Sequence, residues 1–248
     1  MRTQTPVPGS LSALQEVDDR SSHLHRQLIG WIALALPFLL WIISGWRPTP
    51  ELQQWKPLPS VSAYYYTSAV AAFVGSLVAL AAFLATYRGF DNKPWRDRVA
   101  AIVAGGAAVG LAFFPTGAPD GLLPPSWWTT QTRTIHYISA VVLFGALIFF
   151  SLFLFPKSNA TKGNLPTGKK VRNAIYISCG VVMLACMLWA GSAYFTQASI
   201  FWPETIALVF FALSWLTKGR ADWTVGRTIH YGRHPGQLIN DMSRVILG

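Results

Sequence analysis

The chain has 248 residues, of which 52% are hydrophobic and only 12% are charged, with twenty Lys and Arg side chains against ten Asp and Glu. An average soluble domain is about 25% charged, so this composition excludes an ordinary soluble globular protein. A net charge of +10 favours nucleic-acid binding in a soluble chain, but in a membrane protein the basic loops set the topology, and no nucleic-acid partner is expected.

The first 26 residues are a polar tail. Leu11, Leu14 and Val17 recur at helical spacing, which predicts a short surface helix, and an unstructured tail fits equally well. The apolar run that follows is long enough to cross a bilayer, and no small-residue cleavage site comes after it. It therefore indicates an uncleaved signal anchor rather than a secretory signal peptide.

Six apolar segments follow the tail, and a helix that spans a bilayer needs about 20 such residues. The segments are 27–45, 64–87, 99–115, 135–155, 174–195 and 200–217. Lipid leaves no water for unpaired backbone groups, so each segment is predicted to be a helix. We expect an all-α, polytopic transmembrane helical bundle of six spans over 27–217, between a tail at 1–26 and a basic tail at 218–248.

The third segment is the shortest and carries little side-chain bulk. Gly106 and Gly110 stand four residues apart, a spacing that lets the backbone of a neighbouring helix approach closely. We therefore predict tight packing at this glycine face, and a central position for the third helix.

Basic residues give the predicted orientation. Cytoplasmic loops of membrane proteins are enriched in Lys and Arg. With six spans, three of the twenty basic residues fall on one side of the membrane: Arg47, Lys56 and Arg133. All the others fall on the opposite side, which predicts that both termini are cytoplasmic. The cytoplasmic basic loops are expected to contact anionic lipid headgroups, and membrane lipids are the partners this indicates.

Ionisable groups inside spans are the first candidates for function in a membrane protein. His136 enters the fourth segment and Glu204 the sixth, and both fall at the outer side of the membrane. We predict that Glu204 turns inward and lies near His136. Tyr137, Tyr194 and Asp120 complete this candidate outer site. The alternative is that these are polar residues at helix ends that meet headgroups and water.

A second candidate cluster lies on the cytoplasmic side and consists of Arg88, Asp91, Arg172, Asn173 and Tyr176. It either ties the loops together or contacts anionic lipid. No motif of a zinc hydrolase, a nucleophile elbow or a nucleotide-binding loop is present. The sequence therefore predicts no catalytic residue, no metal site and no cofactor.

Several stretches resemble a family of bacterial membrane proteins grouped as domain of unknown function 998. The matching strings include "PSVSAYYYT" at 59–67, "YRGFD" at 87–91, "FFPT" at 113–116, "FFSLFLF" at 149–155, "KKVRNAIYISCGVVMLAC" at 169–186 and "FWPETIALVFFALSWLTKG" at 201–219. The resemblance implies a multi-pass protein of the bacterial inner membrane with about six helices, and it implies no activity.

Three functions stay open. The first is a membrane subunit without enzymatic activity that binds, senses or assists. The second is an intramembrane enzyme that acts on lipid through His136 and Glu204 or through the Arg88 and Asp91 edge. The third is a small transporter or channel, although no carboxylate stands at the midpoint of a span.

Overall fold

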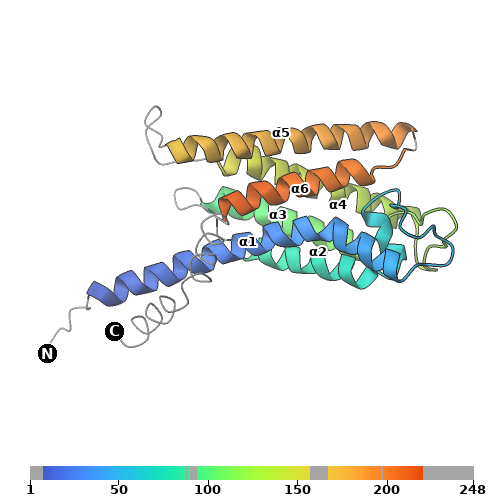
Figure 1. The fold of residues 1–248 in the computed structure, drawn as a ribbon, viewed down its shortest axis with the longest axis horizontal. Helices are drawn as coiled ribbons and strands as arrows, with labels where there is room; N and C mark the ends of the chain where they lie inside the picture. The colour runs from blue at the N-terminus through green and yellow to red at the C-terminus, as the bar shows by residue number, and fades with distance from the viewer. Residues whose placement is uncertain (1–7, 88, 90–93, 157–166, 197, 220–248) are drawn as a thin grey trace.

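The computed structural model describes residues 8–87, 89, 94–156, 167–196 and 198–219. Within them the chain is all-α, with six α-helices that run back and forth along one long axis (Figure 1). They are α1 (Pro8–Trp46), α2 (Val70–Ala85), α3 (Pro94–Phe113), α4 (Thr130–Phe149), α5 (Thr167–Thr196) and α6 (Phe201–Lys218). A 3₁₀ helix, η1 (Ser62–Tyr66), precedes α2, and a π-helical turn, η2 (Phe150–Leu154), continues α4.

The six apolar segments all fold as helices, as predicted. Helix ends follow local chemistry. Pro94 opens α3, where a missing backbone N–H costs nothing, and Thr129 caps α4 by accepting from the backbone N–H of Thr132. The first helix departs from the prediction, because α1 begins at Pro8 and runs without a break into the apolar segment. Its N-terminal part extends beyond the other helices (Figure 1).

Three of the helical segments are long and apolar enough to cross a membrane: His23–Trp46, Thr130–Leu154 and Gly168–Ala193. The other three helices are less typical of spans. Helix α2 has only 16 residues, and α3 carries Arg96, Asp97 and Arg98 near its start. Helix α6 has Glu204 in its first turn and Lys218 in its last.

The helices form a ring in chain order. Each helix packs against the next one in sequence, and α6 packs against α1 to close the ring. The end that holds the 47–61 loop, η1 and residues 114–129 is called the outer end, and the end that holds Tyr87, η2 and Lys218 is called the inner end (Figure 1).

The core of the inner end is aromatic. Trp215 of α6 is fully buried, and its ring centroid lies 4.8 Å from that of Phe155, 5.0 Å from Phe150 and 5.5 Å from Tyr87. These rings come from three separate parts of the chain. Their burial draws α6, η2 and the end of α2 together at the inner end.

The glycine prediction for α3 is wrong at Gly106. A Cβ built at Gly106 meets nothing within 4 Å, because this residue faces away from the ring. Close contacts occur at Gly105 and at Gly110, and the second of these confirms the other half of the prediction. A Cβ at Gly105 would lie 3.1 Å from the Ala81 carbonyl of α2, and one at Gly110 would overlap the Ser139 hydroxyl of α4.

The predicted central position of α3 also needs correction. The helix lies between α2 and α4, but one of its faces is uncovered. The exposed large side chains on this face are Val99, Ile102, Val103, Val109 and Phe113. An apolar face of this kind suits contact with lipid.

Candidate functional site

The predicted outer site begins with His136, in the second turn of α4. The side chain is 2% exposed, and its Nδ1 lies 2.7 Å from the carbonyl oxygen of Phe114 at the end of α3. A carbonyl only accepts, so Nδ1 carries the proton and donates it. Tyr137 follows on α4, with its ring centroid 6.1 Å from that of His136, and it is partly exposed.

His136 is one of three side chains that donate hydrogen bonds to backbone carbonyls just after α3. The Trp128 Nε1–H lies 3.2 Å from the Pro115 carbonyl and 3.1 Å from the Thr116 carbonyl. The Tyr66 hydroxyl donates to the same Thr116 carbonyl. These carbonyls belong to residues 114–116, which directly follow α3, so the three side chains fix the chain where it leaves the helix.

Glu204, the other half of the predicted pair, ties α6 to the outer loop. Its Oε2 accepts a 2.6 Å hydrogen bond from the backbone N–H of Val61. Beside it, the Ile200 N–H donates to the Pro59 carbonyl at 2.7 Å, and the Ser199 hydroxyl donates to the same oxygen at 3.1 Å. Glu204 is half-buried and turned toward the protein, and it holds the start of α6 against residues 59–61.

The predicted contact between His136 and Glu204 is not formed. His136 bonds to the end of α3 and Glu204 to the loop before η1, and α4 and α6 are not neighbours in the ring. Asp120 is exposed in the loop between α3 and α4, and the side chain of Tyr194 lies outside the described residues. His136 and Glu204 are therefore not placed together for acid–base chemistry.

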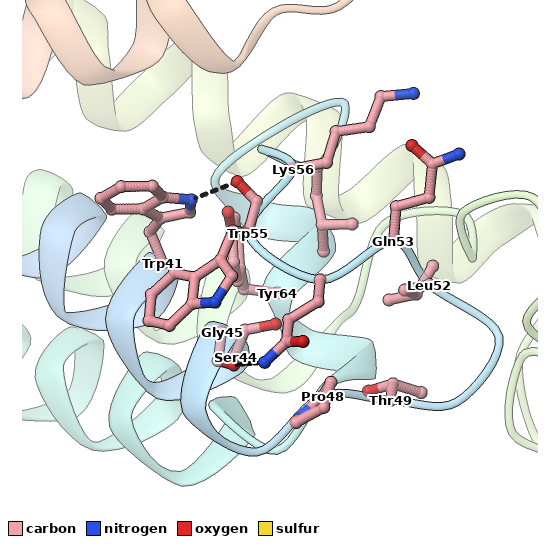
Figure 2. A pocket seen from close by; sticks show the side chains of 12 residues that line it. Trp41, Ser44, Gly45, Pro48, Thr49, Leu52, Gln53, Trp55, Lys56 and Tyr64 are labelled. Atoms are coloured by element: carbon pink, nitrogen blue, oxygen red, sulfur yellow. Dashed lines mark hydrogen bonds between the residues drawn. The ribbon is translucent and has the colours of Figure 1, made fainter.

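A small pocket lies where the end of α1 meets the 47–61 loop (Figure 2). Trp55 adopts a φ of 62°, a conformation that bulky residues rarely take. Two contacts hold it there: the Trp41 Nε1–H donates to the Trp55 carbonyl at 3.0 Å, and the Trp55 ring lies over Gly45. The cavity measures about 10 Å³, which is about the space of one water molecule, so it fits no larger ligand.

The described residues include three of the five members of the second predicted cluster. Arg88 and Asp91 lie outside the described residues. On α5, Arg172 is partly exposed, Asn173 donates from Nδ2 to the Pro156 carbonyl at 3.4 Å, and Tyr176 is buried with its ring centroid 5.4 Å from that of Phe155. Asn173 and Tyr176 therefore contact the segment that leaves η2.

Charged residues that the sequence reasoning missed gather at the inner end. The Arg26 guanidinium of α1 lies 5.9 Å from the ring centroid of Tyr87. Tyr87, which follows α2, and Asp97, on α3, are each 2% exposed. The signal in the sequence was Asp97 itself, a carboxylate at the start of an apolar helix.

Two lysines also meet at the inner end, on the carbonyl oxygen of Phe155. The Nζ of Lys169 lies 3.4 Å from this oxygen and the Nζ of Lys218 lies 3.5 Å from it. The Lys218 ammonium also sits 5.3 Å from the centroid of the Phe155 ring. Lysines from α5 and α6 thus converge on the chain after η2, which had not been expected.

Among the described residues no three His, Cys, Asp or Glu side chains are grouped as a metal site would need. Comparisons with family models, with curated proteins and with solved structures find no match to the chain. The resemblance to domain of unknown function 998 therefore stays a prediction from the sequence.

Proposed function

We propose that the chain is a six-span protein of the bacterial inner membrane, with both termini in the cytoplasm, that binds, senses or assists as a membrane subunit. Support for the topology comes from the alternating helices. The loops after α1 and α3 lie at the same end of the ring (Figure 1), where the Tyr66 hydroxyl joins them through Thr116. Among the described residues, the basic side chains at this end are Arg47, Lys56 and Arg133, and so few of them support a periplasmic assignment.

Packing supports the three helices whose composition is less typical of a span. Helices α2 and α3 lie between α1 and α4 in the ring, and α6 lies between α5 and α1. When α1, α4 and α5 cross the membrane, the helices packed between them lie at the same depth in the bilayer. The 16 residues of α2 rise about 24 Å, and a bilayer adapts to a short span by thinning locally.

One observation carries the proposal of a binding or accessory role. The best candidates for acid–base chemistry, His136 and Glu204, are each engaged by the backbone of the protein itself, through Phe114 and Val61. A catalytic acid–base pair would need both groups within reach of one substrate, whereas these two side chains are held by different segments. Groups that join a helix end to a loop instead stabilise a fixed scaffold.

Reporter fusions test the topology. Fusions after residues 57, 122 and 197 should be active in the periplasm, and fusions at 93, 163 and 248 should be active in the cytoplasm. A cytoplasmic result at 122 would mean that α3 does not cross, and the six-span proposal would fail.

A lipid-turnover experiment tests the role. The purified protein is incubated with isotope-labelled bacterial lipid extract, and the lipids are followed by mass spectrometry. The proposal expects every lipid species to stay unchanged, with some lipid bound. A new product that disappears in both His136→Asn and Glu204→Gln would identify an enzyme and contradict the proposal.

A further inference from the structure

A groove of about 470 Å³ runs between α3 and α4, on the side that faces away from the ring. Sites for small molecules commonly measure about 300–1,000 Å³. The groove is lined by Trp95, Arg96, Val99, Ala100 and Val103 of α3 and by Val142, Gly145, Ala146 and Phe149 of α4. Its walls are apolar along their length, and charge enters at one end.

The charged end of the groove is at the start of α3. The Arg96 guanidinium lies 5.4 Å from the centroid of the Trp95 ring, and both residues are exposed. The neighbouring Asp97 is not part of the groove lining, because its side chain is only 2% exposed and packs against Gly89. The groove thus offers a cation beside an interfacial tryptophan at one end and hydrocarbon along the rest.

The groove is open because a small residue stands on its α4 wall. Gly145 is exposed, and a Cβ built there meets no atom within 4 Å. On either side of it, Val142 is 37% exposed and Phe149 is 41% exposed. An elongated apolar chain can therefore lie along α4 beside Gly145 without displacing any side chain.

We infer that this groove binds one anionic phospholipid, with an acyl chain along Gly145 and Val103 and the headgroup phosphate on Arg96. An arginine guanidinium presents donors that match the oxygens of a phosphate. The inference rests on the proposed topology, which places the start of α3 at the cytoplasmic surface, where anionic lipid and tryptophan both gather.

Native mass spectrometry tests the headgroup. The full chain is released from micelles that contain equal amounts of phosphatidylglycerol and phosphatidylcholine, and the ratio of the two bound lipids is measured. Arg96→Gln should lower the preference for phosphatidylglycerol about fivefold, the effect of one arginine at an anionic surface. Arg98→Gln is the matched control, because Arg98 is exposed on the same helix but does not line the groove. Equal effects of the two substitutions would overturn the inference.

A second pair of variants tests the groove. Gly145→Leu fills it and should remove one bound phospholipid, whereas Gly75→Leu on α2 should leave binding unchanged. Both glycines are exposed with no atom within 4 Å of a Cβ, so both variants should fold. Unchanged lipid binding in Gly145→Leu would overturn the inference while the topology stands. A reporter fused after residue 122 that is active in the cytoplasm would instead contradict the proposed topology, whatever lipid is bound.

Discussion

The two ends of the helix ring stabilise the fold in different ways. At the outer end, side chains make directed hydrogen bonds to backbone groups, as Trp128 and His136 do at the end of α3 and as Glu204 does at Val61. At the inner end, the core is a cluster of aromatic rings around Trp215. Cations lie at the edge of this cluster, as Arg26 does on Tyr87 and Lys218 does on the ring and carbonyl of Phe155.

The outer end is therefore held in one arrangement, whereas the inner end carries positive charge. A hydrogen bond to a buried carbonyl or N–H fixes both direction and distance, so the outer end holds its loops in one arrangement. At the inner end, Arg26 and Lys218 place positive charge at the edge of the aromatic core. Positive charge at this end fits the proposed cytoplasmic side of an anionic membrane.

The largest expected effect is at the inner aromatic core. Trp215→Ala should lower the free energy of unfolding by about 3–5 kcal/mol, because it leaves a large cavity among Phe150, Phe155 and Tyr87. Trp215→Phe is the control and should cost much less, since the indole Nε1 is buried without a hydrogen-bond partner. Denaturant unfolding in mixed micelles measures both. Equal losses would mean that the ring cluster does not hold this end.

The next effect distinguishes the two faces of α3. Gly110→Leu should destabilise the protein by about 1–3 kcal/mol, because the new side chain overlaps Ser139 of α4. Gly106→Leu should be tolerated, because this position is open and faces away from the ring. Melting temperatures in detergent compare the two variants directly. A larger loss at Gly106 would show that this face is covered by a partner.

At the outer end, replacing Glu204 should have a smaller effect on stability, and the conservative change to Gln is the control. Glu204→Leu should cost about 1–3 kcal/mol, because the Val61 N–H loses its acceptor. Glu204→Gln should be milder, because the amide oxygen still accepts. Denaturant unfolding checks the order of the two. If Gln and Leu were equally damaging, the negative charge, and not the hydrogen bond, would be what matters here.

The smallest effect is expected where a cation meets a ring. Lys218→Met should cost about 0.5–1 kcal/mol, the usual size of a cation–π contact. Lys170→Met, at an exposed position on α5, is the control and should be neutral. The difference between their unfolding midpoints measures the ring and carbonyl contacts of Lys218 with Phe155 together. No difference would place the stability of this end in the aromatic rings alone.

The sequence predicts the helices well because their signal is local. Apolar length alone identifies 135–155 and 174–195, which fold as α4 with η2 and as α5. The start of α1 was predicted too late, since Leu11, Leu14 and Val17 marked helical spacing without showing that the helix runs unbroken into the apolar segment.

Contacts between helices were predicted poorly because they depend on how each helix is rotated about its axis. A one-residue difference in sequence turns a helix position by about 100°, which separates Gly106, open to the outside, from Gly105, packed on α2. The same uncertainty misplaced His136 and Glu204. Both are at the outer end, as expected, but they face different neighbours.

Cysteine labelling in the full-length chain tests the six-span account most directly. Asp120, in the loop between α3 and α4, and Lys170, in the first turn of α5, are both exposed. They lie at opposite ends of the ring, because the neighbouring Lys169 contacts Phe155 at the inner end. The native Cys179 and Cys186 are buried. In intact cells a membrane-impermeant maleimide should label Asp120→Cys, whereas Lys170→Cys should be labelled only after the membrane is permeabilised. Labelling of Asp120→Cys only after permeabilisation would contradict the account, because the loop between α3 and α4 would then lie in the cytoplasm.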